Sequence, residues 1–120
     1  MAELQTISPL QTISPTEELD LETIFASRNP VYTLKVRGDS LIDAQICDGD
    51  YVVIERRSVA RNGELVVAVR DTGEATLCRW KQLGQVVRLE KANKAYSTVE
   101  VAADRVKVQG VVIGVLRSFQ

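Results

Sequence analysis

Residues 31–54, VYTLKVRGDSLIDAQICDGDYVVI, contain two apolar runs separated by a polar segment, and these runs decide the predicted fold. In residues 32–37, apolar side chains alternate with polar ones, which is the period-two pattern of a half-buried strand. Residues 51–54 are rich in β-branched side chains and follow an Asp-Gly-Asp turn sequence at 48–50. We therefore predict two strands, with a short helical turn over residues 41–46 between them.

Ser40 stands at the start of that polar segment, directly after Gly38 and Asp39. A glycine lets the backbone turn at the strand end with little steric cost, so the hydroxyl can project where a substrate could reach it. The same residue could also be an ordinary turn serine that bonds its own backbone, as is common in β proteins. The local sequence leaves both interpretations of Ser40 open.

Short runs rich in β-branched residues, separated by turn residues, recur through the rest of the chain. We predict strands at residues 50–56, 65–70, 75–80, 85–90, 98–102 and 106–119, the last one interrupted or bulged at Gly110 or Gly114. No alternation of strands with helices is visible. The pattern indicates a mostly β, antiparallel, partly closed sandwich or barrel.

The N-terminal quarter differs in composition from the rest. All three prolines lie in residues 1–30, and QTISP occurs twice, at residues 5–9 and 11–15. We interpret residues 1–30 as a linker or N-terminal arm, in which 19–26 can form one or two helical turns or lie extended. Residues 31–120 are then one domain, since 120 residues with 45% hydrophobic side chains can bury a modest core.

Composition also limits the chemistry. The chain has no histidine, which excludes a Ser-His-Asp triad, a Cys-His dyad and most catalytic zinc sites, so we expect no cofactor and no metal. The GDSL string at residues 38–41 matches esterases whose serine needs a histidine base, and that function is excluded too. No stretch reaches the ~18 apolar residues of a membrane span, and no signal peptide pattern begins the chain. With only two cysteines, Cys47 and Cys78, we expect a cytoplasmic protein without membrane contact.

Four stretches resemble, in order and at compatible spacing, the C-terminal domain of LexA-type repressors and their UmuD-like relatives. They are residues 31–57, VARNGELVVAV at 59–69, EATLCRW at 74–80 and VQGVVIGVLR at 108–117. The resemblance covers about residues 31–118 and implies a β fold of the LexA and signal-peptidase-like type. It also implies a serine peptidase-like domain whose serine and lysine cleave the repressor's own chain.

Carried over residue by residue, the resemblance places the nucleophile at Ser40 and the general-base lysine at Cys78. A lysine serves as that base only when burial lowers its pKa several units from about 10.4. A cysteine cannot replace it simply, because apolar burial raises the thiol pKa from about 8.5. Lys81 lies three positions further along the strand and faces the other side. We therefore expect an incomplete dyad.

The resemblance implies partners as well. Such repressors form homodimers, bind operator DNA through an N-terminal winged helix-turn-helix that this chain lacks, and respond to a RecA-type filament in the SOS response. The Ala-Gly bond at which the family usually cleaves itself does not occur in this sequence. The leading hypothesis is therefore a dimerisation and regulatory domain that cleaves poorly or not at all. The alternative is an active self-cleaving serine peptidase domain, in which something other than lysine at 78 activates Ser40.

Overall fold

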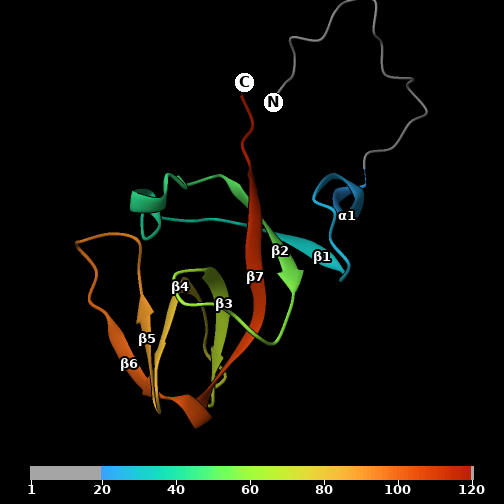
Figure 1. Cartoon of the computed structure of the whole chain (residues 1–120). Helices are drawn as coiled ribbons and strands as arrows, with labels where there is room; N and C mark the ends of the chain where they lie inside the picture. Colours follow the sequence, from blue (N-terminus) through green and yellow to red (C-terminus); the bar gives the residue numbers. More distant parts are fainter. Residues whose placement is uncertain (1–19, 120) are drawn as a thin grey trace, which may run out of the picture.

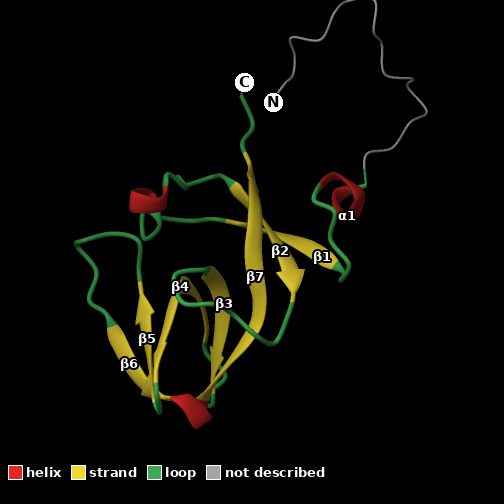
Figure 2. Cartoon of the chain, viewed as in Figure 1, coloured by secondary structure: helices red, strands yellow, loops and turns green. Residues whose placement is uncertain are grey.

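A computed structural model of the chain describes residues 20–119, which form a seven-stranded antiparallel sheet with the order β1-β2-β7-β3-β4-β5-β6 (Figure 1). The strands are β1 (Val31–Lys35), β2 (Tyr51–Arg56), β3 (Leu65–Arg70), β4 (Ala75–Leu83), β5 (Val86–Glu90), β6 (Val99–Ala102) and β7 (Val106–Leu116). Among residues 20–119, helical structure is limited to α1 (Leu21–Ile24) and two 3-10 turns, Ile42–Ala44 and Ala103–Arg105 (Figure 2). The mostly β, antiparallel and partly closed fold predicted from the sequence is confirmed. The two QTISP copies lie outside the described residues.

The sheet curls, and each of its faces packs a separate apolar cluster. One cluster lies over β3 to β6 and includes Val66, Cys78, Trp80 and Leu89. The other lies over β1, β2 and the connection between them, and includes Leu41, which is 1% exposed. Because side chains alternate along a strand, β3 and β4 contribute to both clusters and separate them.

The strand β7 lies between β2 and β3 and joins the two halves of the sheet (Figure 1). Its register shifts once against each neighbour, which leaves Ile113 unpaired opposite β2 and Gln109 unpaired opposite β3. Each bulged residue directly precedes a glycine, Gly114 or Gly110, so the irregularity predicted at these glycines is found there. A β-carbon on Gly110 would lie 2.5 Å from a methyl group of Ile54, which explains why this position needs a glycine.

The first strand differs from its predicted half-buried pattern, and the second, predicted only as a β-branched strand, is buried on both faces. In β1 the side chain of Leu34 is 42% exposed, because β1 is an edge strand and Leu34 lines an open cavity. In β2, residues 52–55 are all buried, because both faces of the strand are covered. The alternation read from residues 32–37 was therefore wrong at Leu34, although Val36 is buried as expected.

Residues 20–30 pack on the sheet. Asp20 caps α1 by accepting a hydrogen bond from the backbone N–H of Glu22 at 3.0 Å, so one helical turn forms where the sequence allowed it. The Phe25 ring covers the space that a side chain at Gly114 would fill. The Ser27 hydroxyl donates to the buried carboxylate of Glu55 in β2. These contacts fix residues 20–30 beside the junction of β2 and β7.

Candidate functional site

Ser40 lies in the turn that follows β1, and the backbone of this turn is fixed by its neighbours. Gly38 has a φ of +86°, a conformation that favours glycine, and its N–H donates to Oδ1 of Asp48 at 2.7 Å. The side chain of Ser40 is half-buried, and its hydroxyl makes no hydrogen bond with the residues that the structure describes. The turn-serine interpretation, in which the hydroxyl bonds its own backbone, therefore finds no support in residues 20–119.

An open cavity of about 300 Å³ contains Ser40. Its apolar wall comes from β1, β3 and β4, and three cationic side chains reach it. The lining residues are Leu34, Lys35, Val36, Arg37, Ser40, Leu41, Val67, Ala75, Thr76, Leu77 and Lys91. The Ser40 hydroxyl has no hydrogen-bond partner among the described residues, and a hydroxyl in a cavity with apolar walls and amines within it is suited to nucleophilic chemistry.

The loop of residues 91–98, which follows β5, is bound to the Ser40 turn. The amide of Asn93 donates to the backbone oxygen of Asp39 at 2.7 Å, and the Tyr96 hydroxyl donates to Oδ1 of Asp39 at 2.8 Å. The hydrogen bond to Asp39 raises the pKa of Tyr96 above its ordinary value. A further bond of 2.7 Å joins the N–H of Asp43 to the carbonyl of Ala92. These hydrogen bonds therefore hold together two segments about fifty residues apart in sequence, next to the cavity.

Lys91 enters the cavity from the start of this loop. Its Nζ donates to Oγ1 of Thr76 at 2.6 Å and to the carbonyl of Leu77 at 3.4 Å, and the side chain is half-buried. Reasoning from the sequence did not identify Lys91 as a site residue. The pairing of β4 with β5 could have indicated it, since Arg79 pairs with Glu90, and continuing that register sets Lys91 opposite Cys78.

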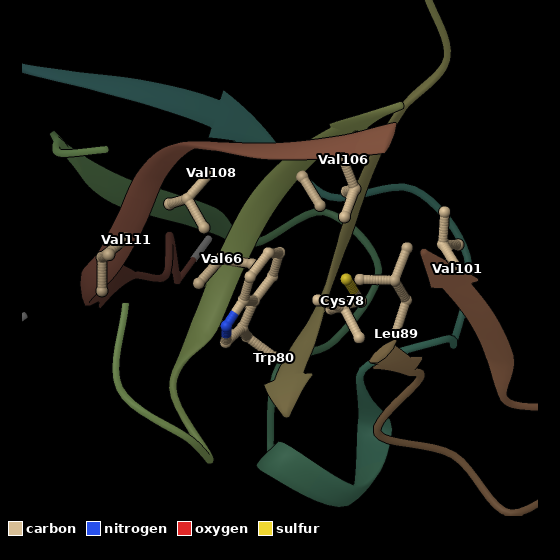
Figure 3. Close-up of a cluster of buried hydrophobic side chains, with 10 residues drawn as sticks. Val66, Cys78, Trp80, Leu89, Val101, Val106, Val108 and Val111 are labelled. Carbon is tan, nitrogen blue, oxygen red and sulfur yellow. The ribbon is translucent and has the colours of Figure 1, made fainter. Parts of the chain in front are cut away.

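Cys78 lies in the apolar cluster over β3 to β6, with Val66, Trp80 and Leu89 around it (Figure 3). Its side chain is fully buried, and this burial raises the pKa of the thiol to about 11. Cys78 does not line the Ser40 cavity. It lines a smaller neighbouring cavity of about 120 Å³, which shares Thr76 and Lys91 with the first. The structure therefore brings Ser40 together with Thr76 and Lys91, and places Cys78 one cavity away.

Comparison with known proteins identifies the family of this chain. The model of the Peptidase S24-like family matches residues 5–113. The chain belongs to the Peptidase S24-like family. It is 46% identical over 96 residues to the LexA repressor of Ruegeria sp. (strain TM1040), covering 80% of the chain and 40% of that repressor. It is 36% identical over 111 residues to the LexA repressor of Zymomonas mobilis, covering 92% of the chain and 51% of that protein. The chain thus spans about half the length of these relatives and corresponds to a LexA-type regulatory C-terminal domain.

A second polar cluster in this S24-like domain lies in the segment between the Ser40 turn and β2. The buried carboxylate of Asp50 accepts from Nη2 of Arg117 at 2.8 Å and from the N–H of Cys47 at 2.8 Å. The Arg117 hydrogen bond holds the pKa of Asp50 below its ordinary value. Cys47 is half-buried, with its sulfur 3.5 Å from Arg117, and the cluster connects the end of β7 to the segment before β2.

Within residues 20–119, no group of three or more acidic or cysteine side chains is arranged to hold a metal ion. No helix among these residues is long and apolar enough to cross a membrane.

Proposed function

We propose that residues 31–120 form the dimerisation and regulatory domain of a LexA-type repressor of the SOS response, with residues 1–30 as an N-terminal arm. The partners are a second copy of the chain, operator DNA bound through an N-terminal winged helix-turn-helix outside these residues, and a RecA-type filament. The protein acts in the cytoplasm. Similarity to LexA repressors over most of this chain, together with an exposed apolar end on β7, supports the proposal.

The observation that carries the regulatory assignment is the burial of Cys78. We propose that Ser40 holds the nucleophile position and Cys78 the position of the family's lysine. A fully buried thiol with a pKa of about 11 is protonated at neutral pH and cannot take the serine proton. This supports an incomplete dyad and a domain that cleaves poorly at neutral pH.

A reactive-serine probe tests this assignment. A fluorophosphonate forms an Oγ–P bond with an activated serine and releases fluoride, so its labelling rate at pH 7 reports activation of Ser40. We expect slow labelling of the natural chain and of the Cys78→Ala variant, none of Ser40→Ala, and at least ~tenfold faster labelling of Cys78→Lys. A lysine at 78 can extend into the neighbouring cavity toward Thr76, where burial disfavours its ammonium form.

Circular dichroism must confirm that the variants fold, because enforcing a neutral lysine at pH 7 costs about 1.4 kcal/mol per unit of pKa shift. Fast labelling of the natural chain at pH 7, with no gain from Cys78→Lys, would contradict the incomplete dyad.

The second candidate function is an active self-cleaving peptidase domain. It is favoured by one observation, the presence of Lys91 in the same cavity as the unbonded Ser40 hydroxyl. A longer protein that includes the N-terminal domain would then separate into two fragments at neutral pH. The proposed regulatory domain would remain intact under those conditions.

A further inference from the structure

We infer that Lys91 is the proton acceptor for Ser40 in this chain, an amine supplied by the end of β5 in place of one at position 78 on β4. The inference rests on the proposed role of Ser40 as the nucleophile. It concerns a residue that neither the spacing of the motifs nor the pattern of the family indicates. It also explains how a domain with a buried thiol at position 78 can keep a weak activity.

The register of the sheet is the first support. Pairs between β4 and β5 run from Leu83 with Val86 to Arg79 with Glu90, and one further step in the same register would set Lys91, the residue after β5, opposite Cys78. Side chains directly opposite each other on antiparallel strands start about 4.5–5.5 Å apart at their β-carbons and share one face of the sheet. A lysine at 91 therefore begins close to the place from which a lysine at 78 would begin.

The contacts of the amine are the second support. Lys91 lines both the Ser40 cavity and the cavity of Cys78, and Thr76, its hydrogen-bond partner, lines both as well. Among the described residues, the hydrogen bonds of Nζ go to Thr76 and Leu77 and not to Ser40. Hydrogen bonds between catalytic groups are often absent before substrate binds, so the amine need not touch Oγ in this state.

The charges around Lys91 are the third support. Across the Ser40 cavity stand Lys35 and Arg37, and in the neighbouring cavity stand Arg70 and Glu74 together with the Cys78 thiol. The one carboxylate in this set, on Glu74, already pairs with Arg70 at 3.3 Å. Among residues 20–119, no carboxylate lies within ion-pair distance of Lys91. Within residues 20–119, no ion pair therefore holds the amine away from Ser40.

The proton transfer balances within the chain. As Ser40 Oγ bonds to the carbonyl carbon of a peptide, its proton passes to the neutral Lys91 amine. The resulting ammonium returns the proton to the departing nitrogen when the C–N bond breaks, and water then hydrolyses the acyl-serine. With a fluorophosphonate the Oγ–P bond forms, fluoride leaves, and the Lys91 ammonium keeps the proton.

Replacement of Lys91 by arginine gives the sharpest test. Arginine keeps the positive charge and a donor for Thr76, but it cannot give up its proton, so a structural role is retained while a base is lost. We expect fluorophosphonate labelling of the natural chain to rise between pH 7 and 10. The Lys91→Arg variant should label at least ~tenfold more slowly at pH 9, since a general base contributes ~10²–10⁴ in rate.

The matched control is Lys94→Arg, three residues along the same loop, where the side chain is exposed. It should label like the natural chain at every pH. The double variant Cys78→Lys with Lys91→Met moves the amine to the opposite strand position and should restore a rate that rises with pH. Circular dichroism of each variant checks the fold.

The outcomes separate this inference from the proposed function. Equal labelling of Lys91→Arg and the natural chain overturns the role of Lys91 and leaves the regulatory assignment intact. No Ser40-dependent labelling at any pH also overturns it. Fast labelling at pH 7 that is lost in Lys91→Arg would support Lys91 while contradicting the proposal of a poorly cleaving domain.

Discussion

Two aspartates hold the residues that flank Ser40, although neither lines its cavity. Asp48 accepts from the N–H of Gly38, and the carbonyl of Asp50 accepts from the N–H of Val36 at 2.7 Å. The side chain of Asp50 accepts in addition from Cys47 and Arg117. The bond from Gly38 goes to a charged carboxylate, which forms a stronger hydrogen bond than a neutral acceptor, whereas the bond from Val36 goes to a neutral backbone carbonyl.

Replacing Asp50 by asparagine should change how stability depends on pH. Its hydrogen bond with Arg117 lowers the pKa of the folded carboxyl below the ordinary 3.8, so its contribution is complete above about pH 4 and is lost as the pH falls through the folded value. We expect Asp50→Asn to lower the free energy of unfolding by about 1 kcal/mol at pH 7, because one charge-assisted acceptor is lost and Arg117 is partly exposed. The difference from the natural chain should shrink toward pH 2.

Urea unfolding at pH 7, 4 and 2 measures this effect, with Asp43→Asn as the control because the Asp43 side chain is exposed. Glu55, whose pKa is lowered by Ser27 and Arg57, keeps some acid sensitivity in both proteins. A constant difference between Asp50→Asn and the natural chain over this range would contradict the assigned pKa direction.

The site could be predicted from the sequence only in part. A glycine and a serine after an alternating strand indicated where Ser40 would lie, because a strand end and its turn are set by neighbouring residues. The role of Lys91 could not be read in the same way. Its place depends on the β4–β5 register and on the hydrogen bonds from Asn93 and Tyr96 to Asp39, which join segments far apart in sequence.

The strand β7 contains two glycines, Gly110 and Gly114, beside which the packing leaves no room for a side chain. A β-carbon on Gly110 would lie 2.5 Å from Ile54 Cγ2 and 3.0 Å from the backbone oxygen of Glu55, both in the neighbouring strand. At Gly114 a β-carbon would instead overlap the ring of Phe25, which belongs to the arm. Overpacking against a central strand has no inexpensive relaxation, whereas Phe25 lies outside the sheet and its ring can shift at a smaller cost.

We therefore predict that Gly110→Ala lowers the free energy of unfolding by about 1–3 kcal/mol, and that Gly114→Ala lowers it less. The double variant Phe25→Ala with Gly114→Ala should be less destabilised than the sum of its single changes, because the overlap is gone. Phe25→Ala with Gly110→Ala should be additive. Thermal or urea unfolding of the two glycine variants, of Phe25→Ala and of the two double variants measures these free energies. An equal loss of unfolding free energy at the two glycines would contradict the packing described.

The ends of β3 and β4 show which strand boundaries depend on neighbouring residues in sequence and which depend on contacts with distant segments. β3 begins and ends where the sequence predicts, at Leu65 and Arg70, because a turn sequence precedes it and another follows. β4 runs to Leu83, three residues beyond the predicted end. That extension depends on pairing with β5 and on the Asn62 side chain, which accepts from the N–H of Gln82 at 2.8 Å. Neither contact is visible in a local pattern.

At the scale of the whole molecule, the end of β7 presents apolar side chains to solvent. Val115 and Leu116 are each 41% exposed, and Phe119 is 79% exposed. Val115 and Leu116 pair across the ladder with Val52 and Tyr51 of β2, so the surface is part of the rigid sheet. Val115 and Leu116 point to opposite faces of the sheet, so apolar surface is exposed on both sides of this strand end. Such exposed apolar surface is typical of an interface, and a second copy related by a two-fold axis would cover part of it.

The last prediction is that Val115→Asp converts a homodimer into a monomer without unfolding it. The Val115 side chain is partly exposed in the single chain, so a carboxylate there stays hydrated in the monomer but would lose its water at a buried dimer contact. Val112→Asp, three positions earlier in β7, serves as the contrast. Val112 packs against the cluster that contains Leu41 and Ile54, so an aspartate at that position should lower the stability of the fold itself.

Sedimentation equilibrium at tens of micromolar, with circular dichroism on the same samples, separates the two effects. We expect a dimer for the natural chain, a folded monomer for Val115→Asp, and a lower unfolding temperature for Val112→Asp. A natural chain that sediments as a monomer would contradict the dimer. A Val115→Asp variant that remains a dimer would place the interface elsewhere on the sheet, away from the exposed end of β7.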